Sequence, residues 1–172
     1  MRKRSRFLAY SAIIAALYAL LCYLQNFLIP GSASWAIQMR AAEALSILAF
    51  FTPAAIPGLG LGCLLFNLSF AGALPLDFLV GTLASCLAAA AMYWLRNCKI
   101  RKLPLLGLLM PGIFNAFLVG WELTAYIGEA FWLNALYVAV GEAVVLYTLG
   151  ALLYTTMKKN GLARKLFGET VG

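Results

Sequence analysis

The chain contains no histidine and only six acidic residues among its 172 residues. Without histidine it offers no Ser/His or Cys/His pair for nucleophilic catalysis, and no cluster of residues has the spacing of a metal site. The four cysteines are scattered without a CxxC spacing, so small apolar packing residues are a better interpretation than disulfides. No GxxxxGK[ST] motif is present, which excludes ATP binding through a P-loop. We therefore expect a protein that is not an enzyme and carries no cofactor.

Charge is also scarce. Charged residues make up 11% of the chain and hydrophobic residues 64%, whereas a soluble domain has about 25% charged residues. The mean hydropathy is +0.91. This composition predicts an all-α integral membrane protein that forms one membrane-embedded domain over residues 1–172. The formal net charge of +7 does not indicate a nucleic-acid partner, because basic residues that flank apolar segments are explained by membrane topology and lipid headgroups.

The basic residues are unevenly distributed. Twelve of the thirteen lie in three short clusters, within Arg2–Arg6, Arg96–Lys102 and Lys158–Lys165. Lys and Arg near the ends of spanning helices stay mainly on the cytoplasmic side. We therefore expect both termini and one middle loop in the cytoplasm, with an even number of crossings between the clusters. This predicts a multi-pass protein of the cell (plasma) membrane.

Apolar segments of suitable length lie between these clusters. A membrane helix needs about 20 apolar residues, or somewhat fewer when it is packed inside protein. The six expected spans are about Phe7–Ile29, Ala41–Thr52, Gly58–Ala71, Leu76–Leu95, Leu103–Leu123 and Glu129–Met157. The first is too long for the apolar region of a signal peptide, so we expect it to be retained. The second and third are short, and a re-entrant pair is the alternative there.

Acidic residues show the opposite distribution from basic ones. Five of the six lie within or at the edges of apolar segments, where a charge costs roughly 2.5–3.5 kcal/mol at the bilayer centre. Asn115 and Glu122 fall on one face of the fifth span, and Glu142 lies in the sixth. One such residue could be a structural hydrogen-bonder. Several that converge from different helices favour a ligand cavity in the outer half of the bundle.

A second polar group is expected at the outer entrance, where Gln38, Arg40 and Glu43 lie close together in the sequence. Arg40 and Glu43 could pair at i, i+3 if this segment is helical, which would be a structural ion pair. Asp77 begins the fourth span, and we expect it to cap that helix.

Small residues suggest where helices approach each other. Gly58 and Gly62 form a small-xxx-small face, which favours packing between membrane helices. In the first span Ala12 and Ala16, overlapped by Ala15 and Ala19, have the same spacing. These alanines could bind a partner helix or pack inside the chain's own bundle, and the sequence favours neither.

The residues discussed above also resemble a known family. Residues 37–45 read IQMRAAEAL, which is similar to the QxRxxEAL signature of the QueT family of queuosine-precursor transport proteins. Further matches to the family pattern are Pro57–Cys63 with Asn67, Asp77–Thr82, Asn115 with Glu122, and Gly141-Glu142. The resemblance extends from the alanine-rich first helix to the end of the sixth span.

The resemblance implies a six-helix substrate-binding (S) component of an energy-coupling factor (ECF) transporter. Such a component works with a transmembrane coupling subunit, on which the first-helix alanines dock, and with two cytoplasmic ATPase subunits. The implied ligand is a 7-deazaguanine: queuine, preQ1 or preQ0. The expected ligand-binding residues are Gln38, Arg40, Glu43, Asn67, Asn115, Trp121, Glu122 and Glu142.

Roles for these residues follow from the chemistry of the implied ligand. Glu142 or Glu122 could accept the adjacent N–H and amino groups of a guanine edge, and the other carboxylate could bind an exocyclic amine. Asn115 and Gln38 would read the carbonyl and ring nitrogens, while Trp121 would stack on the ring. Arg40 and Glu43 would close the outer loop over the ligand. The rival interpretation is a small proton-coupled secondary transporter with an acidic relay, which would need no ATPase.

Overall fold

The computed structural model describes residues 3–30, 39–70, 72–100 and 103–168, and these form a helical bundle. Over these ranges there is no strand, only one antiparallel bridge between Ile100 and Leu103. Four segments of the described chain are long and apolar enough to cross a membrane, by length and composition: Lys3–Leu28, Asp77–Asn97, Leu105–Ile127 and Phe131–Lys159. Ala41–Phe50 and Ala55–Ser69 are shorter apolar helices. Each expected span therefore coincides with a helical element, and two of these elements are short.

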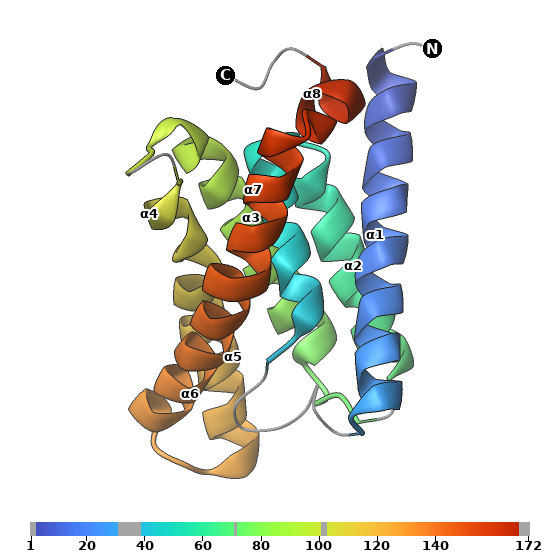
Figure 1. Cartoon of the computed structure of the whole chain (residues 1–172). Coiled ribbons are helices and arrows are strands. Elements are labelled where there is room, and N and C mark those ends of the chain that lie inside the picture. The colour runs from blue at the N-terminus through green and yellow to red at the C-terminus, as the bar shows by residue number, and fades with distance from the viewer. Residues whose placement is uncertain (1–2, 31–38, 71, 101–102, 169–172) are drawn as a thin grey trace.

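The long helical segments run along the bundle axis and alternate in direction from one to the next (Figure 1). Their bounds are α1 Lys3–Leu28, η1 Ala41–Phe50, α2 Ala55–Ser69, α3 Asp77–Trp94, η2 Leu95–Asn97, α4 Leu105–Leu108, α5 Met110–Ile127, α6 Phe131–Val145, η3 Leu146–Gly150, α7 Ala151–Lys159 and α8 Leu162–Phe167. α1 packs on α2, α2 on α3, α3 on α5, and α5 on α6. η3 is a single π-helical turn that joins α6 to α7, so the last long segment continues without a break.

Two helix boundaries differ from the sequence prediction for identifiable reasons. α2 begins at Ala55, before Gly58, because proline is tolerated in the first turn of a helix and Pro57 lies there. α5 continues past Leu123 to Ile127, where Gly128 adopts a left-handed conformation with φ of 84°. A left-handed glycine just after the last helical residue is a common way to end a helix.

η1 occupies the centre of the bundle. It contacts α1, α2, α3, α6, α7 and η3, and eight of its ten residues are buried. It is a 3-10 helix, a form in which runs longer than three or four residues are uncommon. Because other helices surround it, η1 does not have to match the length that lipid imposes on an exposed helix.

The α1–α2 contact depends on two glycines. A Cβ atom on Gly62 would lie 2.7 Å from the Cβ of Tyr18 and 2.8 Å from the carbonyl oxygen of Ala15. A Cβ on Gly58 would lie 2.9 Å from the Cβ of Ile14. The predicted packing face of Gly58 and Gly62 is therefore confirmed, and its partner is α1 of the same chain.

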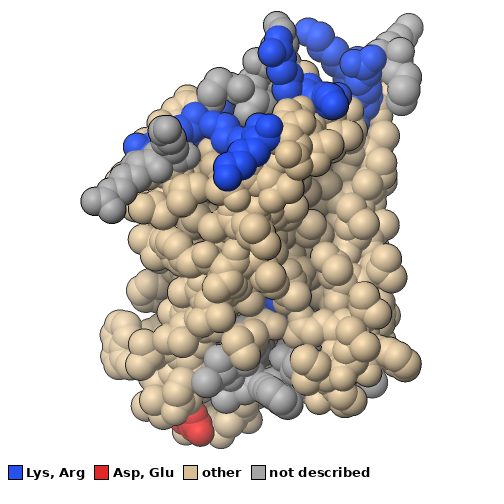
Figure 2. Space-filling model, in the orientation of Figure 1, with Lys and Arg blue, Asp and Glu red and all other residues tan. Residues whose placement is uncertain are grey.

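The two ends of the bundle differ in charge. Basic side chains gather at the end that holds the start of α1 and α8. The surface between the two ends of the bundle carries almost no charge in this view (Figure 2). Glu129 is the exposed acidic residue among those described, since Glu43, Asp77, Glu122 and Glu142 are buried. The basic end, defined here by α8 and the start of α1, lies opposite the α5–α6 turn (Figure 1).

Candidate functional site

Buried polar side chains from several helices meet in the half of the bundle away from the basic end. They surround a small cavity lined by Arg40, Glu43, Cys63, Gly81, Ser85, Asn115, Val119, Val138 and Glu142. The cavity has a volume of about 10 Å³, which is room for about one water molecule. The structure therefore shows a closed site whose polar groups lie close together.

An ion pair links the start of η1 to the start of α3. Arg40 Nη2 donates to Asp77 Oδ2 at 3.2 Å, and the two side chains are only 10% and 7% exposed. The predicted pairing of Arg40 with Glu43 is wrong, because the Arg40 side chain binds Asp77 and only the backbone of Arg40 contacts Glu43, its carbonyl oxygen accepting from the Glu43 N–H at 2.9 Å. The predicted cap is also wrong: α3 has no side-chain cap hydrogen bond, and the Asp77 carboxylate binds Arg40.

The position of Arg40 is fixed by α1. The Gln25 side chain donates to the carbonyl oxygen of Met39 at 2.7 Å and accepts from the backbone N–H of Ala41 at 2.6 Å. The two residues that flank Arg40 are thus tied to the same amide. Gln25 is a site-supporting residue that the sequence analysis did not identify.

Glu43 and Glu142 each accept a hydrogen bond from a side chain on a neighbouring helix. The Tyr18 hydroxyl of α1 donates to Glu43 Oε1, and Asn115 Nδ2 of α5 donates to Glu142 Oε1 at 2.8 Å. The second contact confirms that Asn115 and Glu142 face each other from neighbouring helices. Tyr18 was missed, although a tyrosine in the middle of an apolar helix is itself a signal, because its buried hydroxyl needs a partner.

Glu122 lies one turn beyond Val119 on the same face of α5 and is fully buried. Neither of its carboxylate oxygens has a hydrogen-bond partner among the described residues. Nearby on α6, Asn134 is also buried and donates to Thr124 Oγ1 at 3.1 Å. Glu122 is therefore a buried carboxylate that is free to accept hydrogen bonds.

Asn67 of α2 also belongs to this cluster and contacts the start of α3. Its Nδ2 donates to the carbonyl oxygen of Asp77 at 2.9 Å, and its Oδ1 has no partner among the described residues. Gly81 allows this approach, since a Cβ there would lie 3.0 Å from Asn67 Nδ2.

Unmet hydrogen-bonding capacity is concentrated in this cluster. Over the described part of the chain, six buried side-chain polar atoms lack a partner: Arg40 Nε, Asn67 Oδ1, Asp77 Oδ1, Glu122 Oε1 and Oε2, and Glu142 Oε2. A buried polar atom without a partner costs about 1–3 kcal/mol, and more when it is charged. Such a concentration at one place is typical of a site that binds a polar ligand.

The remaining expected residues lie elsewhere. Trp121 does not line the cavity and is 54% exposed, because a step of one residue rotates a helix by about 100° from the buried Glu122. On α1, Ala15 is buried against α2, whereas Ala12 and Ala16 are exposed and Ala19 is partly buried. Gln38 lies outside the described residues.

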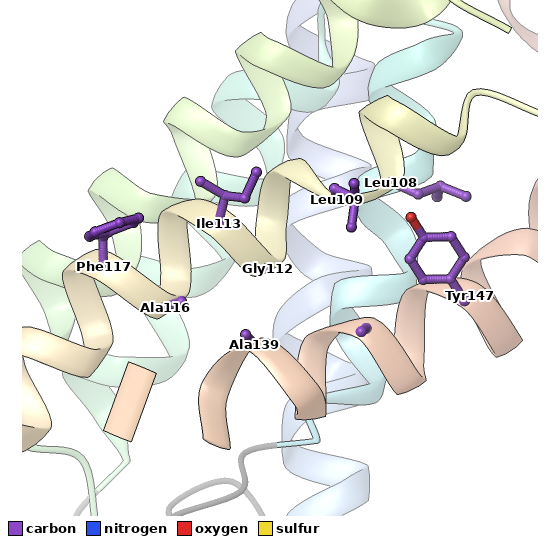
Figure 3. Close-up of a pocket in the computed structure, with 9 residues that line it drawn as sticks. Leu108, Leu109, Gly112, Ile113, Ala116, Phe117, Ala139 and Tyr147 are labelled. Atoms are coloured by element: carbon purple, nitrogen blue, oxygen red, sulfur yellow. The ribbon is translucent and has the colours of Figure 1, made fainter. Parts of the chain in front are cut away.

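A larger cavity of about 200 Å³ lies between the α4–α5 segment and α6 (Figure 3). Its walls include Leu109, Ile113 and Phe117 on one side and Ala139 on the other, with Tyr147 at one end. The Tyr147 hydroxyl donates to the carbonyl oxygen of Leu105 at 3.0 Å. No ionisable acid or amide lines this space, so it cannot match the hydrogen bonds of a polar base.

The family comparison agrees with this geometry. The model of the QueT transporter family matches residues 8–159, which include every described residue of the polar cluster. The chain belongs to the QueT transporter family. Comparison with curated proteins and with solved structures gave no match. As a member of a transporter family with apolar helices of spanning length, the chain is a membrane protein that takes part in transport.

Proposed function

We propose that this QueT family member is the S component of an ECF transporter and captures a queuosine precursor from outside the cell. The observation that carries the proposal is the group of six unpartnered buried polar atoms around Arg40, Glu122 and Glu142. In a membrane bundle such groups are retained for a ligand or an ion pathway. Since the chain has no P-loop, separate ATPase subunits would supply the energy.

The charge of the cluster favours a ligand with an amine. Among the described residues, four carboxylates (Glu43, Asp77, Glu122 and Glu142) and one cation, Arg40, are buried, and Arg40 is already bound to Asp77. Glu142 Oε2 could accept from the guanine edge of a 7-deazaguanine. Glu122, with both oxygens open, could bind the exocyclic amine of preQ1 or queuine.

Ligand entry requires the closed cavity to open. A bicyclic base is much larger than the single water that the cavity would hold. We propose that Arg40 and Glu43 move with the start of η1 as the ligand enters, and that Gln38 and Trp121 approach the ligand in the bound form. Asn67 and Asn115 would stay in place, because each donates a hydrogen bond to a neighbouring helix, Asn67 to the Asp77 carbonyl oxygen and Asn115 to Glu142.

In the membrane we propose six spans, with the basic end in the cytoplasm. η1 would cover about 20 Å at 2.0 Å per residue, and α2 about 22 Å at 1.5 Å per residue. Both are shorter than the hydrocarbon core of about 30 Å, and the longer helices around them would make up the difference. The polar cavity then lies in the outer half of the membrane.

The proposed surface for the coupling subunit is the exposed face of α1 that carries Ala12 and Ala16, with Ala19 at its edge. Ala15 would support this face from behind by its contact with α2. We expect Ala12→Leu with Ala16→Leu to abolish co-purification of the coupling subunit while ligand binding stays intact. Val140→Leu, at an exposed position on α6, is the control and should keep the complex.

The test of the proposed ligand is calorimetric titration of the purified chain with queuine, preQ1, preQ0 and guanine. We expect the two amine-bearing compounds to bind most tightly. Glu142→Gln should weaken binding about 30-fold or more, the usual effect of removing a buried charged partner. Glu129→Gln removes an exposed carboxylate and should leave affinity unchanged. Equal affinity for guanine and preQ1, or unchanged affinity in Glu142→Gln, would overturn the assignment.

A proton-coupled secondary transporter is the second candidate, and the open carboxylate of Glu122 favours it. Transport assays in vesicles separate the two mechanisms. Uptake by this chain alone that collapses with the proton gradient would support proton coupling. Uptake that requires the coupling and ATPase subunits would support the ECF mechanism.

A further inference from the structure

A third cavity lies at the basic end of the bundle, between the start of α1 and α8. It has a volume of about 450 Å³ and is lined by Arg6, Ala9 and Tyr10 of α1 and by Lys165, Leu166, Phe167 and Gly168 at the end of the described chain. Basic side chains gather at this end (Figure 2), and the cavity shares no lining residue with the polar cavity.

The two walls of this cavity are held together by specific contacts. The Tyr10 hydroxyl donates to the carbonyl oxygen of Leu166 at 2.5 Å. The rings of Tyr10 and Phe167 meet edge to face, with centroids 5.3 Å apart and planes at 72°. Gly161, at φ 64°, ends the preceding helix and turns the chain so that α8 lies against α1 (Figure 1). The cavity is therefore defined by the packing of two helices.

The lining of the cavity has two chemical characters. Arg6 and Lys165 supply two cations from different helices, and none of the described residues that line the space is acidic. Ala9 and Phe167 supply an apolar floor. An occupant that satisfies both must carry a negative charge next to an apolar part.

We propose that this cavity binds the headgroup of an anionic phospholipid, with its phosphate between Arg6 and Lys165. Exposed apolar side chains continue from the cavity along the bundle surface: Phe7 and Leu8 are 38% and 60% exposed, and Leu166 is 49% exposed. These give the acyl chains a surface that a soluble phosphate would not use. Guanidinium and ammonium groups bind phosphate through charge-assisted hydrogen bonds, and basic sites at the membrane surface favour anionic lipids.

Native mass spectrometry of the full chain in detergent tests the site. Phosphatidylglycerol and phosphatidylcholine with identical acyl chains are added separately, and the fraction of protein that retains one lipid is measured. We expect phosphatidylglycerol to be retained preferentially. Arg6→Gln with Lys165→Gln should lower its affinity about 25-fold, at about fivefold for each cation removed.

Two further double variants distinguish a defined lipid site from general electrostatic attraction of anionic lipid to the basic end. Arg4→Gln with Lys159→Gln removes two exposed charges from the same end without altering the cavity, and should retain most of the preference for phosphatidylglycerol. Arg6→Lys with Lys165→Arg keeps both charges and should also retain it. Thermal unfolding of each variant verifies that it is folded. Equal retention of both lipids by the original chain, or equal loss in the Arg4/Lys159 and Arg6/Lys165 variants, would overturn the proposal.

Discussion

The half of the bundle near the basic end and the opposite half are built differently. Near the basic end the core is aromatic and aliphatic: the Phe51 and Tyr154 rings stack with centroids 5.2 Å apart, and Phe50 meets Tyr154 edge to face at 5.7 Å. In the opposite half the apolar cluster is small, centred on Val119 and Val138, and it lies beside carboxylates and amides. The half near the basic end therefore stabilises the fold, while the opposite half contains polar groups that can bind a ligand.

The two largest expected effects on stability are of similar size, and the first concerns the aromatic half. Phe50→Ala removes a ring that packs against Tyr154 and fills the space beside Gly107. We expect a loss of about 3–5 kcal/mol in the free energy of unfolding, as is usual for a buried Phe-to-Ala change. Thermal unfolding in detergent measures the loss. Ligand affinity at a temperature where the variant is folded should be unchanged, and a large change there would mean that the two halves are not independent.

The ion pair in the polar half gives the next prediction. Arg40→Met leaves the buried Asp77 carboxylate without its cation. We expect a loss of about 3–5 kcal/mol in the free energy of unfolding. Adding Asp77→Leu removes the orphaned charge and should restore most of the stability, because a buried pair can often be replaced by apolar residues at little cost. Thermal unfolding of the single and double variants provides the comparison. A double variant no more stable than Arg40→Met would show that the pair does not act as a unit.

The smallest effect on stability is expected at Glu122. Glu122→Gln removes a buried carboxylate whose oxygens have no partner, and keeps the shape of the side chain. We expect stabilisation of about 1 kcal/mol, or about 2–4 °C in Tm, together with weaker binding of the amine-bearing ligands. Glu129→Gln is the matched exposed control. A drop in Tm for Glu122→Gln would indicate that the carboxylate stabilises the unliganded protein.

The sequence predicted the helical segments well, because long apolar runs bounded by basic clusters leave few alternatives. Asn115 and Glu142 were predicted to converge, since helical spacing places each on an inward face, and their hydrogen bond confirms it. The six spans and their orientation remain predictions.

Contacts between segments far apart in the chain could not be predicted in the same way. The pairing of Arg40 with Asp77 depends on how η1 meets α3, which no local pattern specifies. A clue was nevertheless present, because Arg40 is the one cation among several intramembrane acids and a cation there needs a carboxylate partner. The bonds from Gln25 and Tyr18 to η1 likewise depend on the docking of α1.

The 3-10 geometry of η1 has a mechanical consequence. An α-helix of the same ten residues would be about 5 Å shorter, because its rise is 1.5 Å rather than 2.0 Å per residue. The far end of η1 is anchored in the aromatic core through Phe50, while its near end carries Glu43. Rewinding this stretched element as an α-helix would therefore retract Glu43 towards the core by about 3.5 Å, at about 0.5 Å for each residue between it and Phe50.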